Sequence, residues 1–103
     1  MNAGFVYIMS NKSRSTIYIG VTSNLEVRVI EHRTGLGSEF TSKYKCFDLL
    51  FYEYHNKISH AIEREKQLKN WHREWKLNLI KEENPELNDL SESIGIDPET
   101  SSG

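Results

Sequence analysis

Two stretches near the start of the chain constrain its fold more than any other part. Residues 5–9 and 16–21 are dense in β-branched and aromatic residues, and the six residues between them are all polar. Residues of these types favour strands, and a short polar segment between two such stretches is typical of a β-hairpin. Neither stretch alternates cleanly between apolar and polar residues, which indicates a sheet that is covered on both faces.

A first helix is predicted directly after this hairpin. Ser23 and Glu26 form the S-x-x-E pattern of a capping box at its start, and Gly35 is suited to the left-handed position that commonly follows a helix. Residues 35–45 are then expected to form a loop. At 100° per residue, four residues share one side of the helix: Leu25, Arg28, Val29 and His32.

A third strand is expected at residues 47–54, followed by a second helix. Strict alternation along this strand places Leu49, Phe51 and Glu53 on one face and Leu50, Tyr52 and Tyr54 on the other. The second helix is predicted to be capped by Ser59 and to extend to residue 81, with a break near residues 70–72 left open.

The end of the chain completes the expected fold. Asn84 followed by Pro85 is typical of the start of a further helix. The order β-β-α-β-α-α predicts an α+β fold, a three-stranded antiparallel sheet flanked by helices. We expect one domain at residues 1–90 and a disordered acidic tail at residues 91–103.

Charge is distributed unevenly along the 103 residues. Thirteen basic and eight acidic side chains lie within residues 1–81, which gives that part a net charge of +5, whereas residues 82–103 hold seven acids and no base. A basic body suits a polyanionic partner such as nucleic acid. A solvated surface with an acidic tail is the alternative.

Several classes of protein are not expected for this chain. Its longest unbroken apolar run, residues 5–9, is far shorter than the roughly 20 residues of a membrane span. No basic stretch precedes a hydrophobic segment at the start, so we expect no signal peptide and no membrane partner. The single cysteine, Cys46, excludes an internal disulfide and a cysteine-based zinc site. These observations favour a cytoplasmic protein.

Tyr7 and Tyr18 form the first candidate site. Side chains on one face of a hairpin can meet across its two strands, and paired phenols can orient a water or take its proton if a local field lowers their pKa. Gly20 would lie on the same face as Tyr18 and leave room for the backbone of a ligand. Ordinary packing of strand tyrosines is the alternative interpretation.

Arg28 and His32 form a second candidate, one turn apart on the first predicted helix. The planar guanidinium of arginine donates two parallel hydrogen bonds to phosphate oxygens, and a histidine beside it can hold a phosphate or a water. A surface arginine next to a core histidine would give the same pattern.

Glu65 is the third candidate, because it falls within the apolar stripe of the second helix. That stripe contains Ala61 and Leu68, while Glu63 lies on the opposite face. A carboxylate on a core-facing side is costly unless a cation meets it. The cation is either a structural Arg or Lys or a divalent metal ion.

The order of these pieces resembles a known family. The chain carries FVY at residues 5–7, YIG at 18–20, L-x-x-R-x-x-x-H at 25–32 and AI-x-RE-x-x-LK at 61–69. Together they resemble the GIY-YIG nuclease domain, in particular the small stand-alone proteins related to the excinuclease nuclease domain. The resemblance covers residues 4–88 and implies an α+β fold and hydrolysis of a DNA phosphodiester bond with one divalent metal ion, Mg²⁺ or Mn²⁺.

The resemblance also implies roles for individual residues. Tyr7 and Tyr18 match the two motif tyrosines, Arg28 the arginine that stabilises the phosphate, His32 the position four residues later, and Glu65 the metal-binding glutamate. Asn84 is the candidate for the family's C-terminal asparagine. Four basic residues are expected to contact the backbone of nucleic acid, DNA rather than RNA: Lys43, Lys45, Arg64 and Lys69. For Lys43 and Lys45, charges that only make the loop soluble are an equal alternative.

The resulting hypothesis is a metal-dependent endonuclease, with DNA repair or recombination as its setting. The alternative is a non-catalytic module on the same scaffold that binds nucleic acid or protein.

Overall fold

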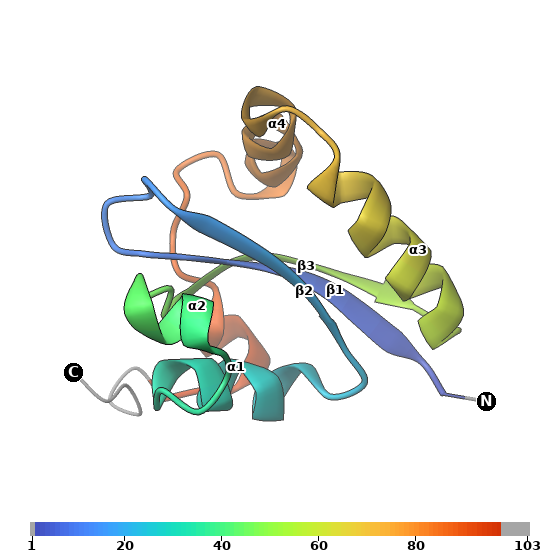
Figure 1. Cartoon of the computed structure of the whole chain (residues 1–103), viewed down its shortest axis with the longest axis horizontal. Coiled ribbons are helices and arrows are strands. Elements are labelled where there is room, and N and C mark those ends of the chain that lie inside the picture. The colour runs from blue at the N-terminus through green and yellow to red at the C-terminus, as the bar shows by residue number, and fades with distance from the viewer. Residues whose placement is uncertain (1, 98–103) are drawn as a thin grey trace.

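The predicted hairpin forms, and a third strand extends it into an antiparallel sheet (Figure 1). β1 (Gly4–Ser10) is the central strand and pairs with β2 (Ile17–Thr22) on one side and β3 (Asp48–His55) on the other. The structure, a computed structural model, describes residues 2–97. The element order is β-β-α-α-β-α-α, so the α+β prediction is confirmed with one more helix than expected.

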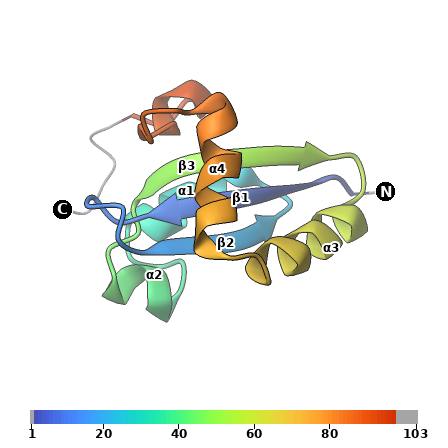
Figure 2. The ribbon, with the colours of Figure 1, turned by 90° about the horizontal axis from the view of Figure 1, so that it is seen from above.

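Helices cover both faces of the sheet (Figures 1 and 2). α1 (Leu25–Arg33) and α2 (Glu39–Lys43) lie below it in Figure 1, whereas α3 (Ile58–Lys69) and α4 (Arg73–Glu83) lie above it. α2 occupies the segment expected to be a loop. Ser38 starts this helix, because its side-chain oxygen accepts a hydrogen bond from the backbone N–H of Thr41.

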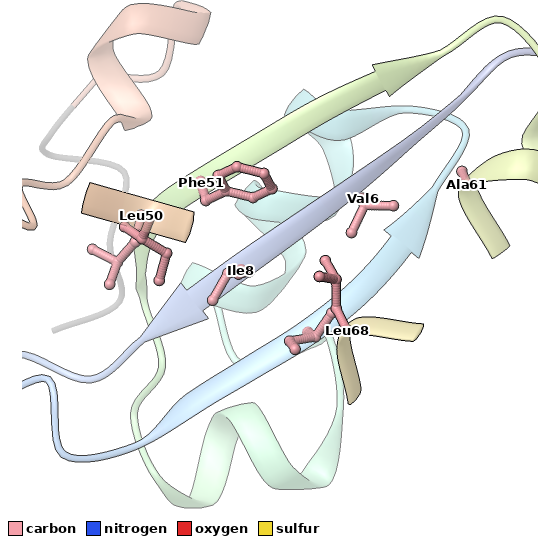
Figure 3. Close-up of a cluster of buried hydrophobic side chains, with 8 residues drawn as sticks. Val6, Ile8, Leu50, Phe51, Ala61 and Leu68 are labelled. Atoms are coloured by element: carbon pink, nitrogen blue, oxygen red, sulfur yellow. The ribbon is translucent and has the colours of Figure 1, made fainter. Parts of the chain in front are cut away.

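Each face of the sheet has its own hydrophobic core, which confirms a sheet covered on both sides. The upper core joins the sheet to α3 and α4 (Figure 3) and consists of Val6, Ile8, Ile19, Leu50, Phe51, Ala61, Leu68 and Ile80. The lower core joins it to α1 and the C-terminal segment and consists of Tyr7, Met9, Leu25, Val29, Cys46, Leu49 and Ile96. Burial of a large apolar side chain contributes about 1.5–3 kcal/mol, so both layers are firmly attached.

A β-bulge in β3 changes which residues share a face. Ile8 pairs with Phe51 but Met9 pairs with Leu49, so Leu50 is the extra residue on its strand. Leu50 and Phe51 therefore both enter the upper core, while Leu49 enters the lower one. The strict alternation expected for this strand was wrong at Leu49 and Leu50, because an alternating pattern assumes one residue opposite each partner.

The helix ends differ from expectation by one residue or more. Asn24, and not Ser23, caps α1, since its side-chain oxygen accepts the backbone N–H of Val27 at 3.2 Å. The N-cap residue of α3 is Lys57, two residues before the expected cap Ser59, and the helix begins at Ile58. The break at residues 70–72 is real, so the helical phase of α3 does not continue into α4, and Trp75 is exposed.

Asn84 ends α4 and begins no further helix. The next helical turn within residues 2–97 is a 3₁₀ turn at Ser91–Ile94. Ser91 and Ile96, both expected in the tail, are buried, so the packed part of the chain extends at least to Ile96. Residues 98–103 of the expected tail lie outside the described residues. No helix in the described part is long and apolar enough to cross a membrane.

Candidate active site

Three polar side chains meet between β1 and α1. Tyr7 points from β1 toward α1, where Arg28 and His32 lie one turn apart and both face it. The hydroxyl of Tyr7 is 2.8 Å from Nε2 of His32, and Nε of Arg28 donates a long hydrogen bond of 3.4 Å to the same oxygen. We call these three residues, together with Tyr18, the Tyr7 cluster.

Burial sets the protonation of this cluster. Tyr7 is 1% exposed and His32 is fully buried. Burial raises the pKa of Tyr7 to about 12, although the hydrogen bond from Arg28 acts in the other direction. Burial, reinforced by the charge of Arg28, lowers the pKa of His32 to about 4. At neutral pH both side chains are uncharged, so the lowered tyrosine pKa considered from the sequence does not occur at Tyr7.

Arg28 is the charged member of the cluster. Its hydrogen bond with Tyr7 is the main reason that its pKa is raised, which keeps the guanidinium charged. Nη1 also binds Oε1 of Glu31 at 3.1 Å. The side chain is partly exposed, and its five N–H groups exceed these two bonds, so it can still donate to an anionic oxygen.

Tyr18 lies beside Tyr7 on the same face, as expected. Its ring centroid is 6.4 Å from that of Tyr7 and 5.4 Å from that of His32. Tyr7 is paired with Gly20 across the strands, and a Cβ atom at Gly20 would collide with the phenol of Tyr7. The space at Gly20 thus holds the Tyr7 ring, and the expected room for a ligand backbone is not there.

Glu65 lies on α3, in the layer above the sheet. The helical phase is confirmed, since Glu63 is exposed while the side chain of Glu65 is only 14% exposed. Its Oε2 pairs with Nζ of Lys69 at 3.1 Å, and that lysine is 52% exposed. Within residues 2–97 no hydrogen bond joins Glu65 to the Tyr7 cluster, but its charge contributes to the raised pKa of Tyr7.

A groove along the outer edge of β2 connects the two layers. Six residues line it: Ile17, Tyr18, Ile19, Phe40, Lys69 and Lys76. Tyr18 belongs to the Tyr7 cluster and Lys69 pairs with Glu65. One member of the cluster below the sheet, Tyr18, and the lysine that pairs with the Glu65 carboxylate above it therefore line the same edge groove.

Comparison with known proteins bears on the same residues. A family model described as the GIY-YIG catalytic domain matches residues 3–78. The chain belongs to the GIY-YIG family. Its similarity to a UPF0213 protein of Staphylococcus haemolyticus is 35% identity over 78 residues, 76% of this chain and 94% of the relative. UPF0213 proteins of Staphylococcus saprophyticus and Staphylococcus aureus are 33% and 34% identical over 82 residues, 80% of this chain and 99% of each relative. No solved structure matches significantly.

The four basic residues proposed to contact the backbone of nucleic acid have different surroundings in this GIY-YIG domain. Lys69 lines the edge groove. Lys43 and Lys45 are exposed near the end of α2, and Nζ of Lys43 lies 5.4 Å from the ring centre of Tyr44. The side chain of Arg64 is already engaged by two neighbours. Its Nε donates to Glu53 at 3.1 Å, and its guanidinium lies over the ring of Trp71.

Asn84 is fully explained by the fold of the GIY-YIG domain. Its buried amide donates to the carbonyls of Leu50 at 3.0 Å and Asn88 at 2.9 Å, and its oxygen accepts from the N–H of Asn88 at 3.0 Å. These bonds attach the end of α4 to β3. Among the described contacts, none joins Asn84 to the Tyr7 cluster.

Thr41 is a member of the site that the sequence reasoning missed. Its hydroxyl lies 2.9 Å from Nδ1 of His32, on the opposite side of the ring from Tyr7. The short helix α2 carries it into the interior, and Thr41 is fully buried. The only available signal was Ser38 as a helix cap, which is weak for a helix of five residues.

Proposed function

We propose that this GIY-YIG domain is a metal-dependent endonuclease that hydrolyses phosphodiester bonds of DNA, in repair or recombination. The observation that carries the proposal is the Tyr7 hydroxyl, which is bonded to both the guanidinium of Arg28 and an uncharged nitrogen base, His32. Packing alone requires neither partner. A phosphoryl-transfer site uses both, a base for the proton of water and a cation for the phosphate.

In the proposed reaction Tyr7 passes on a proton and never has to ionise. A water proton moves to the Tyr7 oxygen while the Tyr7 proton moves to Nε2 of His32, which becomes an imidazolium. The hydroxide forms a bond to phosphorus, and the bond from phosphorus to the 3′ oxygen breaks with its electron pair on that oxygen. Tyr7 suits this role better than Tyr18, because the described bond to His32 belongs to Tyr7. Tyr18 then orients the water.

Arg28 would stabilise the charge that develops on the phosphate. Its free N–H groups are preorganised by the bonds to Tyr7 and Glu31, so the side chain need not reorganise as the charge grows.

Glu65 suits a divalent ion such as Mg²⁺ or Mn²⁺. Mg²⁺ is commonly held by one or two carboxylates together with substrate phosphate and water. Residues 2–97 contain no group of three or more His, Cys, Asp and Glu side chains placed to hold an ion, so an ion at Glu65 would have fewer than three such protein ligands. Glu65 is mostly buried, and the described ion pair that it makes is with the half-exposed Lys69. A bound ion would supply Lewis-acid stabilisation of the phosphate and of the leaving oxygen.

The edge groove gives the substrate a path to these residues. Lys69 and Lys76 line it beside the rings of Tyr18 and Phe40, and none of the described lining residues is acidic. Lysines neutralise phosphates without reading sequence, and aromatic rings provide surfaces for bases. Binding should accordingly weaken as salt increases.

Cleavage assays with matched glutamate variants test this proposal. Supercoiled plasmid and branched DNA are incubated with the protein in Mg²⁺, Mn²⁺ or EDTA. We expect cleavage with metal, none in EDTA, none by Glu65→Ala, and wild-type cleavage by Glu63→Ala, whose side chain is exposed on another side of the same helix. Binding without cleavage under every condition would instead identify a non-catalytic module. Cleavage that survives Glu65→Ala would remove the assigned metal ligand.

A further inference from the structure

A chain of buried hydrogen bonds continues past the Tyr7 cluster into α2. It runs from the hydroxyl of Tyr7 to Nε2 of His32 at 2.8 Å, and from Nδ1 of His32 to the hydroxyl of Thr41 at 2.9 Å. The Thr41 hydroxyl lies 2.8 Å from that of Ser38 and 3.3 Å from the Ser38 carbonyl. Tyr7, His32 and Thr41 are each at most 1% exposed, so in the free protein their bonds to one another are shielded from bulk water.

Hydrogen-bond chemistry gives this chain a direction. The Ser38 carbonyl can only accept, so the Thr41 hydroxyl donates its own proton there and accepts from Nδ1–H of His32. Nε2 then accepts the proton of Tyr7, whose oxygen accepts from Arg28. A neutral imidazole whose Nε2 accepts must carry its proton on Nδ1. That proton is donated to Thr41, whose hydroxyl still has a proton to donate to Ser38.

The backbone holds the ring in this position. A Cβ atom at Gly37 would collide with Nδ1 of His32, so the chain passes directly against the side of the ring that faces Thr41. The edge of the Tyr18 ring packs against the imidazole as well. The ring is enclosed, and Thr41 provides its hydrogen-bond partner at Nδ1.

We propose that Thr41 is a positioning residue that accepts the Nδ1 proton of His32 and so keeps Nε2 available for the proton of Tyr7. This inference rests on the proposed nuclease function, because it assigns Thr41 the task of orienting the base in that reaction. When Tyr7 passes its proton to Nε2, the Nδ1 proton remains on the ring and stays bonded to Thr41. The imidazolium that forms is thus stabilised by a partner already in place.

Nitrogen NMR of histidine-labelled protein tests the tautomer without any nuclease assay. In the wild type we expect the His32 proton on Nδ1. Thr41→Val keeps the shape but removes the acceptor, and should populate the Nε2-protonated form, whereas Thr41→Ser should restore the wild-type state. A wild-type His32 protonated on Nε2 would overturn the proposal even if the protein cleaves DNA, and this measurement stands if Thr41→Val does not fold.

Steady-state kinetics then measure the consequence for catalysis. We expect Thr41→Val to lower kcat at least tenfold with little change in KM, and Thr41→Ser to recover most of it. Ser42→Ala is the matched control, since Ser42 is exposed on the same short helix, and it should behave as the wild type. Folded Thr41→Val with wild-type kcat would overturn the positioning role. Absence of cleavage by the wild type would overturn the proposed function but leave the tautomer result intact.

Discussion

Mild acid should destabilise this protein through a single side chain, His32. Burial and the charge of Arg28 lower its pKa to about 4, against the opposing charge of Glu31, whereas an unfolded histidine titrates near pH 6.5. Between these values the unfolded chain binds a proton that the folded chain does not, so the free energy of unfolding falls as the pH falls. From these two pKa values, the free energy of unfolding falls by about 2 kcal/mol between pH 7 and pH 5, and by about 3 kcal/mol between pH 7 and pH 4.

Equilibrium unfolding in urea, repeated from pH 7 to pH 5, measures this effect. The matched variant His32→Gln retains hydrogen-bonding groups but does not titrate, so its free energy of unfolding should fall by about 2 kcal/mol less than that of the wild type. In thermal melts the same difference corresponds to roughly 10 °C for a domain of this size. Parallel pH profiles for the two proteins would refute the assignment of His32 as a buried neutral base.

Two further substitutions test the geometry of the site. Gly20→Ala should lower the free energy of unfolding by about 1–3 kcal/mol, because the added Cβ collides with the buried phenol of Tyr7, and unchanged stability in urea would mean that Tyr7 can move aside. Replacing Lys76 with Ala should reduce the slope of log binding constant against log salt for a single DNA strand by about 0.7, measured by fluorescence anisotropy in EDTA, where Lys69 still pairs with Glu65. The same change at the exposed Lys57 and Lys81, which do not line the groove, should leave that slope as it is.

Local patterns predicted the elements of the fold but not their details. The hairpin, the third strand and the buried side of α1 follow from residue type and from the 100° helical step, both of which act between near neighbours. The bulge at Leu50 depends on how β3 pairs with β1, which no pattern within β3 records. α2 has only five residues, too few for a periodic pattern to be visible.

The site could be predicted only as a set of side chains, and their electrostatics required the fold. Spacing placed Arg28 and His32 on one face and distinguished Glu65 from Glu63, and the structure confirms both placements. The raised pKa of Tyr7 comes from its burial between the sheet and α1, and this burial depends on the packing of distant segments. Thr41 follows His32 by nine residues in the sequence. It contacts His32 only because α2 folds against α1.

The Glu65–Lys69 pair is compatible with a working metal site and does not obstruct it. A pair four residues apart on a helix with one half-exposed partner is worth about 0.3–0.5 kcal/mol, so little free energy is required to open it. Without Lys69, the mostly buried carboxylate would lie uncompensated near Tyr7. In the proposed nuclease, an ion that binds Glu65 takes over this compensation, and Lys69, which already lines the edge groove, becomes available to the phosphate backbone. Under that proposal the same lysine would stabilise the free protein and bind the substrate, and the pair would open when substrate and metal ion bind.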